Sequence, residues 1–140
     1  MQTRISPRQQ GDIGEKSALC WFIEQGVTVY LPFGHSPDID LIANFGDHVS
    51  RVQVKTSTVF AKGRWMVTLA TRGGNQSWSG LVKYFGADRC DHLFVLVADG
   101  RRWFIPAADV EGKSGLLLGG PKYAAFEVES DRPFSVALVA

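Results

Sequence analysis

Asp40, Gln53 and Lys55 are the residues of this chain whose types best suit chemistry at a metal ion. A carboxylate oxygen and an amide oxygen are hard donors that suit Mg²⁺, which binds only one or two carboxylates and keeps several waters for the substrate. An ammonium group beside such a cation can orient or deprotonate an attacking water and face the charge that develops on a phosphate. The three residue types together therefore suit hydrolysis at a phosphate.

A hairpin is expected to bring these three residues together. The runs 38–45 and 48–57 are strand-like, and the Gly-Asp pair between them favours a two-residue type II′ loop. With that loop, opposed residues have numbers that add up to 93, so Asp40 faces Gln53 and Lys55 lies on the diagonal. The other face of the hairpin is apolar and suited to packing, with Ile39, Leu41, Val52 and Val54.

Glu15 has two interpretations. Asp12 followed three residues later by Glu15 has the form of a capping box that begins a helix, and Gly26 ends that helix. Glu15 also shares one helical face with the apolar residues Leu19, Phe22 and Ile23. If that face packs on the sheet, Glu15 faces the site and takes a direct or water-mediated part in metal binding. Both interpretations remain open.

The remaining elements indicate an α+β class, with one helix first and then mostly strands. We expect a strand at 27–33, the hairpin strands above, a strand at 64–71, and a second hairpin with strands at 92–98 and 101–105 around Asp99-Gly100. Residues 106–110 suit a short helix, residues 112–121 a loop and residues 122–128 a last strand. The ambiguous segment 81–85 is read as one helical turn or two.

Composition favours a single soluble domain over residues 1–140. Hydrophobic residues make up 45% and charged residues 21%, and there is no repeat or linker, which excludes disordered and fibrous classes. The first residues are polar and the apolar runs are too short to cross a bilayer, so we expect neither a targeting segment nor a membrane partner. Cys20 and Cys90 lack a CxxC pattern and are expected to be small buried hydrophobic residues in a reducing cytoplasm.

The net charge of +1 hides an uneven distribution. No acidic residue occurs between Asp47 and Asp88, whereas six basic residues do, so that stretch carries +6 and the rest of the chain −5. A solvated sheet face with scattered lysines is one interpretation, and a surface for nucleic-acid phosphates is the one we favour. The candidate DNA contacts in this stretch are Lys62, Arg64, Arg72, Asn75, Gln76, Trp78 and Lys83.

Two segments resemble the core of the PD-(D/E)xK nucleases. Residues 37–43, Pro-Asp-Ile-Asp-Leu-Ile-Ala, precede residues 51–57, Arg-Val-Gln-Val-Lys-Thr-Ser, and later runs at 91–97 and 103–106 match as well. The resemblance covers roughly residues 11–106 and is closest to small group I intron homing endonucleases and related prokaryotic enzymes. It implies a restriction-endonuclease-like α/β core, a mixed sheet flanked by helices. Pro37-Asp38 matches the motif name literally, whereas Asp40 shares the face of Gln53 and Lys55 in the two-residue-loop hairpin. Asp38 has the same parity and is the alternative, at the rim of the site; we favour Asp40.

The resemblance implies a divalent-metal-dependent DNA endonuclease, of a homing or other site-specific type. It implies that Asp40, Gln53, the Val54 carbonyl and Glu15 hold Mg²⁺, with Mn²⁺ as a substitute, and that Lys55 positions the nucleophile. Gln53 departs from the usual acidic residue, which lowers the expected metal affinity. The alternatives are a nuclease selective for branched DNA, like a Holliday junction resolvase, and a catalytically silent DNA-binding module. A homodimer or homotetramer is expected, since one small subunit offers limited surface for a long site.

Overall fold

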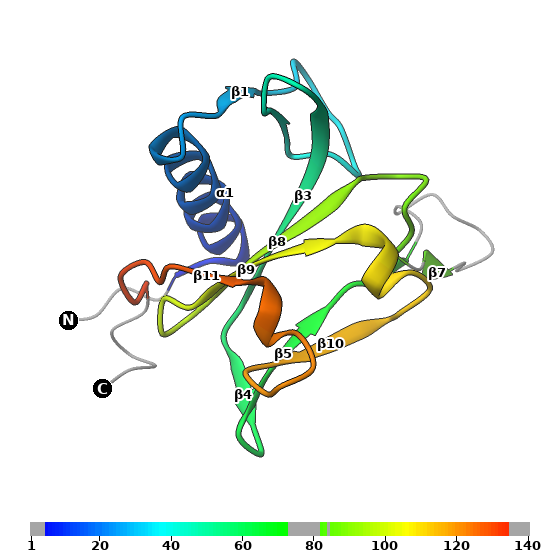
Figure 1. The fold of residues 1–140 in the computed structure, drawn as a ribbon. Coiled ribbons are helices and arrows are strands. Elements are labelled where there is room, and N and C mark those ends of the chain that lie inside the picture. Colours follow the sequence, from blue (N-terminus) through cyan, green and yellow to red (C-terminus); the bar gives the residue numbers. More distant parts are fainter. Residues whose placement is uncertain (1–4, 73–81, 84, 135–140) are drawn as a thin grey trace.

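Six strands form the main sheet of the structure, a computed structural model that describes residues 5–72, 82–83 and 85–134 (Figure 1). In spatial order they are β1 (Thr28–Tyr30), β2 (Leu41–Asn44), β3 (Val49–Ser57), β8 (His92–Val97), β9 (Arg102–Pro106) and β11 (Glu127–Val128). Neighbouring strands are antiparallel except β3 and β8, which pair in parallel from Val52 to Ser57 and from His92 to Val97. The sheet is therefore mixed, as the sequence predicts.

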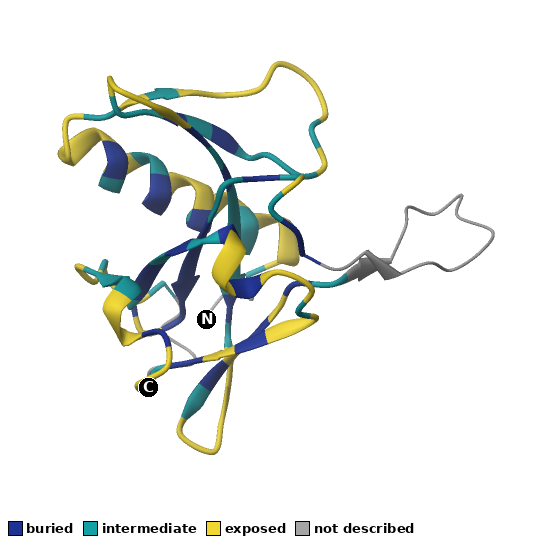
Figure 2. Cartoon of the chain, turned by 45° about the vertical axis from the view of Figure 1, so that its right-hand side comes forward, coloured by how far each residue is buried: buried dark blue, intermediate teal, exposed yellow. Residues whose placement is uncertain are grey.

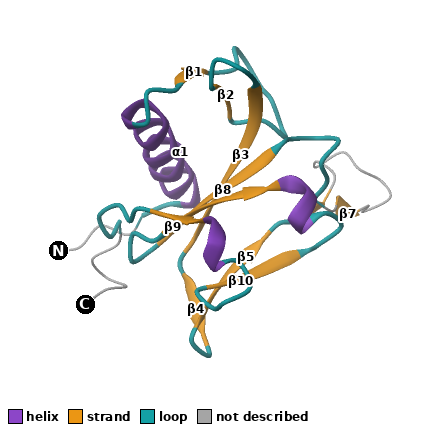
Figure 3. Ribbon diagram, viewed as in Figure 1, coloured by secondary structure: helices purple, strands orange, loops and turns teal. Residues whose placement is uncertain are grey.

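A second, three-stranded sheet covers one face of the main sheet (Figure 3). Its order is β10 (Gly115–Leu118), β5 (Arg64–Thr68) and β4 (Val59–Ala61), and all of its pairs are antiparallel. The larger hydrophobic core lies between the two sheets, where Trp103 and Leu118 are fully buried. The remaining elements are short: β6 (Thr71–Arg72) pairs with β7 (Val82–Lys83), and two 3₁₀ turns are η1 (Ala107–Val110) and η2 (Ala124–Phe126).

Helix α1 (Pro7–Glu24) covers the other face of the main sheet. It begins six residues before the expected start, because Ser6 and Gln9 form the capping box: the Ser6 hydroxyl accepts from the Gln9 amide at 3.1 Å, and the Gln9 side chain accepts from the Ser6 amide at 2.9 Å. The prediction that Asp12 and Glu15 form the cap is therefore wrong. Both residues lie inside the helix, so capping does not account for Glu15.

The buried face of α1 is also rotated relative to the expected one. Gly14, Ser17, Ala18 and Phe22 are buried, whereas Ile23 is 57% exposed and Glu15 is exposed as well, so neither faces the sheet. The reason is packing: small residues at positions 14 and 18 let the helix approach the sheet closely. The expectation that Ile23 faces the sheet is wrong.

Both expected hairpins are present, and the first has the predicted register. Leu41 pairs with Val52 and Asn44 with Val49, so opposed numbers add up to 93, and Gly46 adopts the positive φ of 97° that the first loop position of a type II′ turn requires. In the second hairpin, β8 pairs with β9 around Asp99-Gly100. A two-residue loop fixes strand register, which is why alternation in the sequence predicts the pairs of the first hairpin. Opposed residues of the second hairpin have numbers that add up to 198, so its loop has three residues, 98–100.

Other boundaries differ from those expected. The segment 112–121, expected to be a loop, contains β10, and most of the expected strand 122–128 is a turn with only Glu127–Val128 in the sheet. β1 stops before Pro32, which has no amide hydrogen for the ladder. The expected strand 64–71 is divided between β5 and β6. The expectation of helical turns at 81–85 is wrong for residues 82–83, which form β7 by pairing with β6, and residues 81 and 84 lie outside the described residues.

The last described residues tie α1 to the β8–β9 hairpin. The Ser17 hydroxyl donates to Asp131 at 2.7 Å, the buried guanidinium of Arg102 donates to the Ser17 hydroxyl at 3.2 Å, and the Trp21 indole donates to Glu129 at 2.8 Å. The main chain of Asp131 also donates to the Gly100 carbonyl at 2.7 Å. Where the chain is described, no helix combines the length and the apolar character needed to cross a membrane.

Candidate active site

Asp40 lies just before β2, and its side chain takes the place of a strand partner for β3. The Asp40 amide donates to the Val52 carbonyl at 2.9 Å, and the Asp40 carboxylate accepts from the Val54 amide at 2.7 Å through Oδ2. The β2–β3 ladder ends at Leu41, so the expected strand 38–45 is too long at this end. The carboxylate is thereby fixed at the edge of β3, with Oδ1 turned away from that hydrogen bond.

Gln53 and Lys55 lie on β3, on either side of Val54. Val52 is fully buried and Val54 partly buried in the core under α1, so strand alternation points Gln53 and Lys55 to the opposite face. Lys55 is close enough to Asp40 for its charge to act on that carboxyl. The structure therefore places Asp40, Lys55 and the main chain of Val54 in one cluster.

Glu15 lies on α1 close enough to Asp40 for the charge of that carboxylate to act on it, and its neighbour Gly14 packs directly on β3. A Cβ built on Gly14 would lie 2.2 Å from the Thr56 methyl carbon and 3.3 Å from a Val54 methyl carbon. No side chain fits at this contact, so the helix backbone lies against the strand that carries Lys55. The sequence analysis did not identify Gly14 as a contact residue. The pattern that indicates such a contact is the set of small residues at 14, 17 and 18, which share one helical face.

Replacing Gly14 by alanine is expected to push α1 away from β3 and to move Glu15 out of the cluster. Overpacking of this kind typically costs about 1–3 kcal/mol, so thermal unfolding should show a lower Tm and cleavage should fall with it. Gly11→Ala is the matched control: it is also helical, nothing lies within 4 Å of its Cβ position, and the change should stabilise the protein by up to about 1 kcal/mol. Equal Tm values for the two variants would contradict the close contact.

Both carboxyls of the cluster have perturbed pKa values. Burial raises the pKa of Asp40 above its ordinary value, against the opposing effects of the Val54 hydrogen bond and of Lys55. Burial, and then the charges of Asp40 and Asp12, raise the pKa of Glu15. Carboxyl groups whose ionised forms are disfavoured in this way are typical of functional sites, where a cation offsets their charge.

These groups fit a hard divalent cation. Carboxylate, amide and main-chain oxygens are the ligands that Mg²⁺ prefers. Within residues 5–72, 82–83 and 85–134, no three His, Cys, Asp or Glu side chains converge in the way a closed protein cage requires. A cation held here would therefore depend on the Gln53 amide, the Val54 carbonyl and water in addition to the two carboxylates.

A groove of about 440 Å³ runs along β3 beside this cluster. β3 pairs with β2 only as far as Val52, so its later half has β8 on one side and the groove on the other. Gln10 and Gly11 of α1 form one wall, and Val59, Met66, Thr68 and Ala70 form the other. Lys55 lines the groove, so an extended ligand in it passes directly over the lysine.

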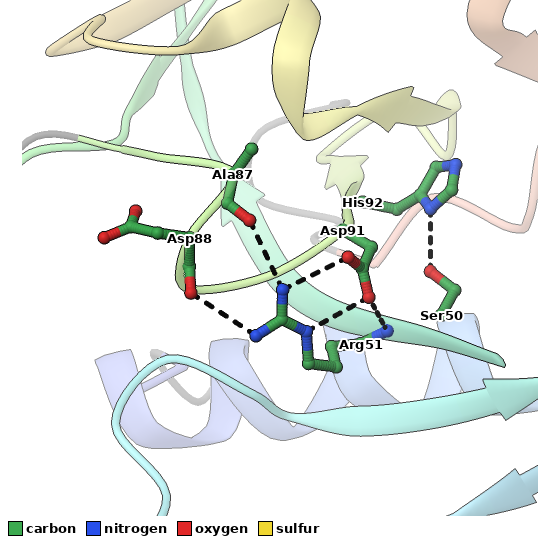
Figure 4. A network of polar contacts seen from close by, with 6 residues as sticks. All are labelled: Ser50, Arg51, Ala87, Asp88, Asp91 and His92. Atoms are coloured by element: carbon green, nitrogen blue, oxygen red, sulfur yellow. Dashed lines mark hydrogen bonds and ion pairs between the residues drawn. The ribbon is translucent and has the colours of Figure 1, made fainter.

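Arg51 anchors β3 to the segment before β8 (Figure 4). Its side chain binds Asp91 at 3.1 and 3.2 Å and the carbonyls of Ala87 and Asp88 at 3.3 Å, and its amide donates to Asp91 at 2.8 Å. The Arg51 guanidinium lowers the pKa of Asp91. One of the six cations of the acid-free stretch is therefore paired with an acid from outside it. Beside this pair, the His92 ring lies 2.7 Å from the Ser50 hydroxyl.

The candidate DNA contacts are only partly placed. Lys62 is exposed at the turn between β4 and β5, and Arg64 is half-buried at the start of β5. Arg72 and Lys83 are described only as backbone, in β6 and β7. Asn75, Gln76 and Trp78 lie outside the described residues.

The two cysteines are free thiols in different surroundings. Cys90 is buried, as expected, and burial raises its pKa to about 11, which leaves an unreactive thiol. Cys20 is exposed, so the expectation that it is a buried residue is wrong. It lies on α1 outside the stripe of small residues that faces the sheet.

Residues 5–115 match the family model for PD-(D/E)XK endonucleases. This match spans most of the chain and includes α1, the β2–β3 hairpin and the groove-lining strands. The chain belongs to the PD-(D/E)XK endonuclease family and is a nuclease by descent.

One solved structure confirms the fold. The chain is similar to I-Ssp6803I, a bacterial homing endonuclease, with a TM-score of 0.75 and 19% sequence identity over 87% of this chain and 88% of that one. A second similar structure is MepB, with a TM-score of 0.43 and 15% identity over 73% of this chain and 78% of that one. No curated protein sequence is similar enough to count as a match. The restriction-endonuclease-like α+β class is thus confirmed, with a sheet instead of helices on one face among the described residues.

Proposed function

We propose that this protein is a divalent-metal-dependent endonuclease that cleaves duplex DNA at preferred sites, as homing endonucleases do. Water attacks the phosphorus in line, and the bond from phosphorus to the leaving sugar oxygen breaks as the new bond forms. The observation that supports this most is the cluster of Asp40, Glu15 and Lys55 at the edge of a groove, in a chain of the PD-(D/E)XK family.

Each residue has a separate role in this proposal. Asp40, the Gln53 amide and the Val54 carbonyl hold Mg²⁺, or Mn²⁺ in its place, and Glu15 completes the set directly or through water. The cation, when bound, supplies Lewis-acid stabilisation of phosphate charge and makes water more acidic. Val54 keeps the Asp40 carboxylate oriented through its amide. Lys55 positions the attacking water and stabilises the negative charge that develops on the phosphate.

Supercoiled plasmid tests the proposal. With Mg²⁺ the protein should convert it to nicked and linear forms, and with EDTA it should not. A four-way junction compared with a linear duplex of the same sequence separates a site-specific enzyme from one selective for branched DNA. Failure of the wild type to cleave, together with cleavage by Gln53→Glu, would show a silent module that has lost one acid. Light scattering decides between the homodimer and the homotetramer that we propose.

A further inference from the structure

Three exposed apolar residues form a row across the outer face of the three-stranded sheet. Val59 pairs with Met66, and Met66 pairs with Leu117, so the three side chains lie side by side on one face. They are 52%, 46% and 56% exposed, respectively, whereas the alternate residues of β5 and β10 are buried in the core. Figure 2 shows the tip of the β4–β5 hairpin as exposed. We call Val59, Met66 and Leu117 the apolar row.

The sheet that carries the apolar row has no negative charge. Residues 59–68 and 115–118 contain no Asp or Glu, and Lys62 and Arg64 lie at the turn of the hairpin. Lys62 adopts a positive φ of 54° and Gly63 one of 77°, so the turn is tight and the two strands stay paired up to it. A projecting, acid-free two-stranded ribbon is complementary to a polyanion.

The apolar row is continuous with the catalytic groove. Val59 and Met66 line the same groove as Lys55. The hairpin is also fixed to β3 two residues beyond Lys55: the Ser57 hydroxyl donates to the Met66 carbonyl and accepts from the Val59 amide at 3.1 Å. A DNA strand with its phosphate at Lys55 therefore presents its neighbouring nucleotides to this hairpin.

We propose that the β4–β5 hairpin enters the major groove beside the cleaved phosphate, and that the apolar row, which Leu117 of the adjoining strand β10 completes, reads thymine through its C5-methyl group. This inference rests on the proposed function, since it takes duplex DNA as the substrate. The major groove is about 12 Å wide and admits a two-stranded ribbon such as β4–β5. In that groove only thymine presents a methyl group, and apolar side chains are its natural partners.

The experiment separates base reading from cleavage because it measures binding in EDTA. The wild-type protein selects its preferred sites from a duplex library with random sequence, and each thymine of the selected site is then replaced by uracil, which removes only the methyl group. Burial of one methyl group corresponds to about a fourfold change in affinity. We expect replacement of one to three thymines near the cleaved bond to weaken binding by about that factor each.

The Met66→Ser/Leu117→Ser double variant should lose this discrimination, with a thymine-to-uracil affinity ratio near one. The ratio cancels any general loss of affinity, and a thermal melt confirms that the variant is folded. Ile23→Ser is the matched control, since Ile23 is an equally exposed apolar residue on α1, and it should keep the wild-type ratio.

Several results would overturn the inference. They are selection of no sequence by the wild type, a ratio near one for the wild type, and an unchanged ratio in the folded double variant. A double variant that keeps the ratio but changes from a dimer to a monomer would assign the apolar row to self-association instead. Absence of plasmid cleavage together with an intact thymine preference would contradict only the proposed nuclease activity.

Discussion

Replacing Asp40 by asparagine should abolish cleavage and, at the same time, make the metal-free protein more stable. Loss of the carboxylate removes a metal ligand, and we expect a decrease in rate of at least about 10³-fold, at the upper end of the effect of deleting one electrostatic contact. The amide oxygen of asparagine can still accept from Val54. Because burial raises the pKa of Asp40 in the folded state, the neutral side chain avoids the cost of a buried charge.

The pH dependence gives the sign of this stability effect. A carboxyl whose pKa is raised by folding costs stability when ionised, so stability is lost as the pH rises through the folded-state pKa. The higher Tm of Asp40→Asn should therefore be seen at neutral pH and should vanish once the pH falls below the unfolded-state pKa. Added Mg²⁺ should raise the Tm of the wild type and not that of the variant. Asp38→Asn is the control; an inactive Asp38→Asn with an active Asp40→Asn would move the site to Asp38.

Replacing Lys55 by alanine should lower the cleavage rate by about 10²–10⁴-fold, the usual contribution of a positioned proton-transfer group. Metal binding should survive, because Lys55 is not a ligand, and the loss of a nearby cation is expected to raise the pKa of Asp40 further. The measurements are single-turnover cleavage with saturating DNA and the Tm increase caused by Mg²⁺. Lys122→Ala, a change at an exposed lysine outside the groove, should behave as the wild type. A Lys55→Ala enzyme that cleaves at the normal rate would remove this residue from the mechanism.

Local rules predicted the part of the site that depends on local pairing. A Gly-Asp loop between two alternating runs determines which residues face one another, and the β2–β3 register follows from it. The same reasoning extended β2 through Asp40, whereas the strand stops at Leu41 and the Asp40 side chain replaces the missing main-chain partner. A side chain that accepts a hydrogen bond from the backbone in this way produces no periodic pattern in the sequence.

Elements that depend on distant partners were harder to predict. β10 lies in a glycine-rich segment, and its strand conformation comes from pairing with β5, about 50 residues earlier. The cap of α1 was misplaced because Asp12-x-x-Glu15 and Ser6-x-x-Gln9 are both acceptable patterns, and only the fold selects one of them. Helix propensity cannot decide between two such patterns, because tertiary packing determines which of them forms the cap.

The ties between α1 and residues 129–131 also bear on the order in which the protein is made. The ribosome synthesises α1 first, but Ser17 and Trp21 can form their hydrogen bonds only after Asp131 and Glu129 have been synthesised. In the same way, β3 can form its parallel pairing only after β8 has been synthesised. Such distant pairings form late in folding. The helix that carries Glu15 is thus secured by residues that are synthesised long after it, and a chain translated only as far as β9 lacks these contacts.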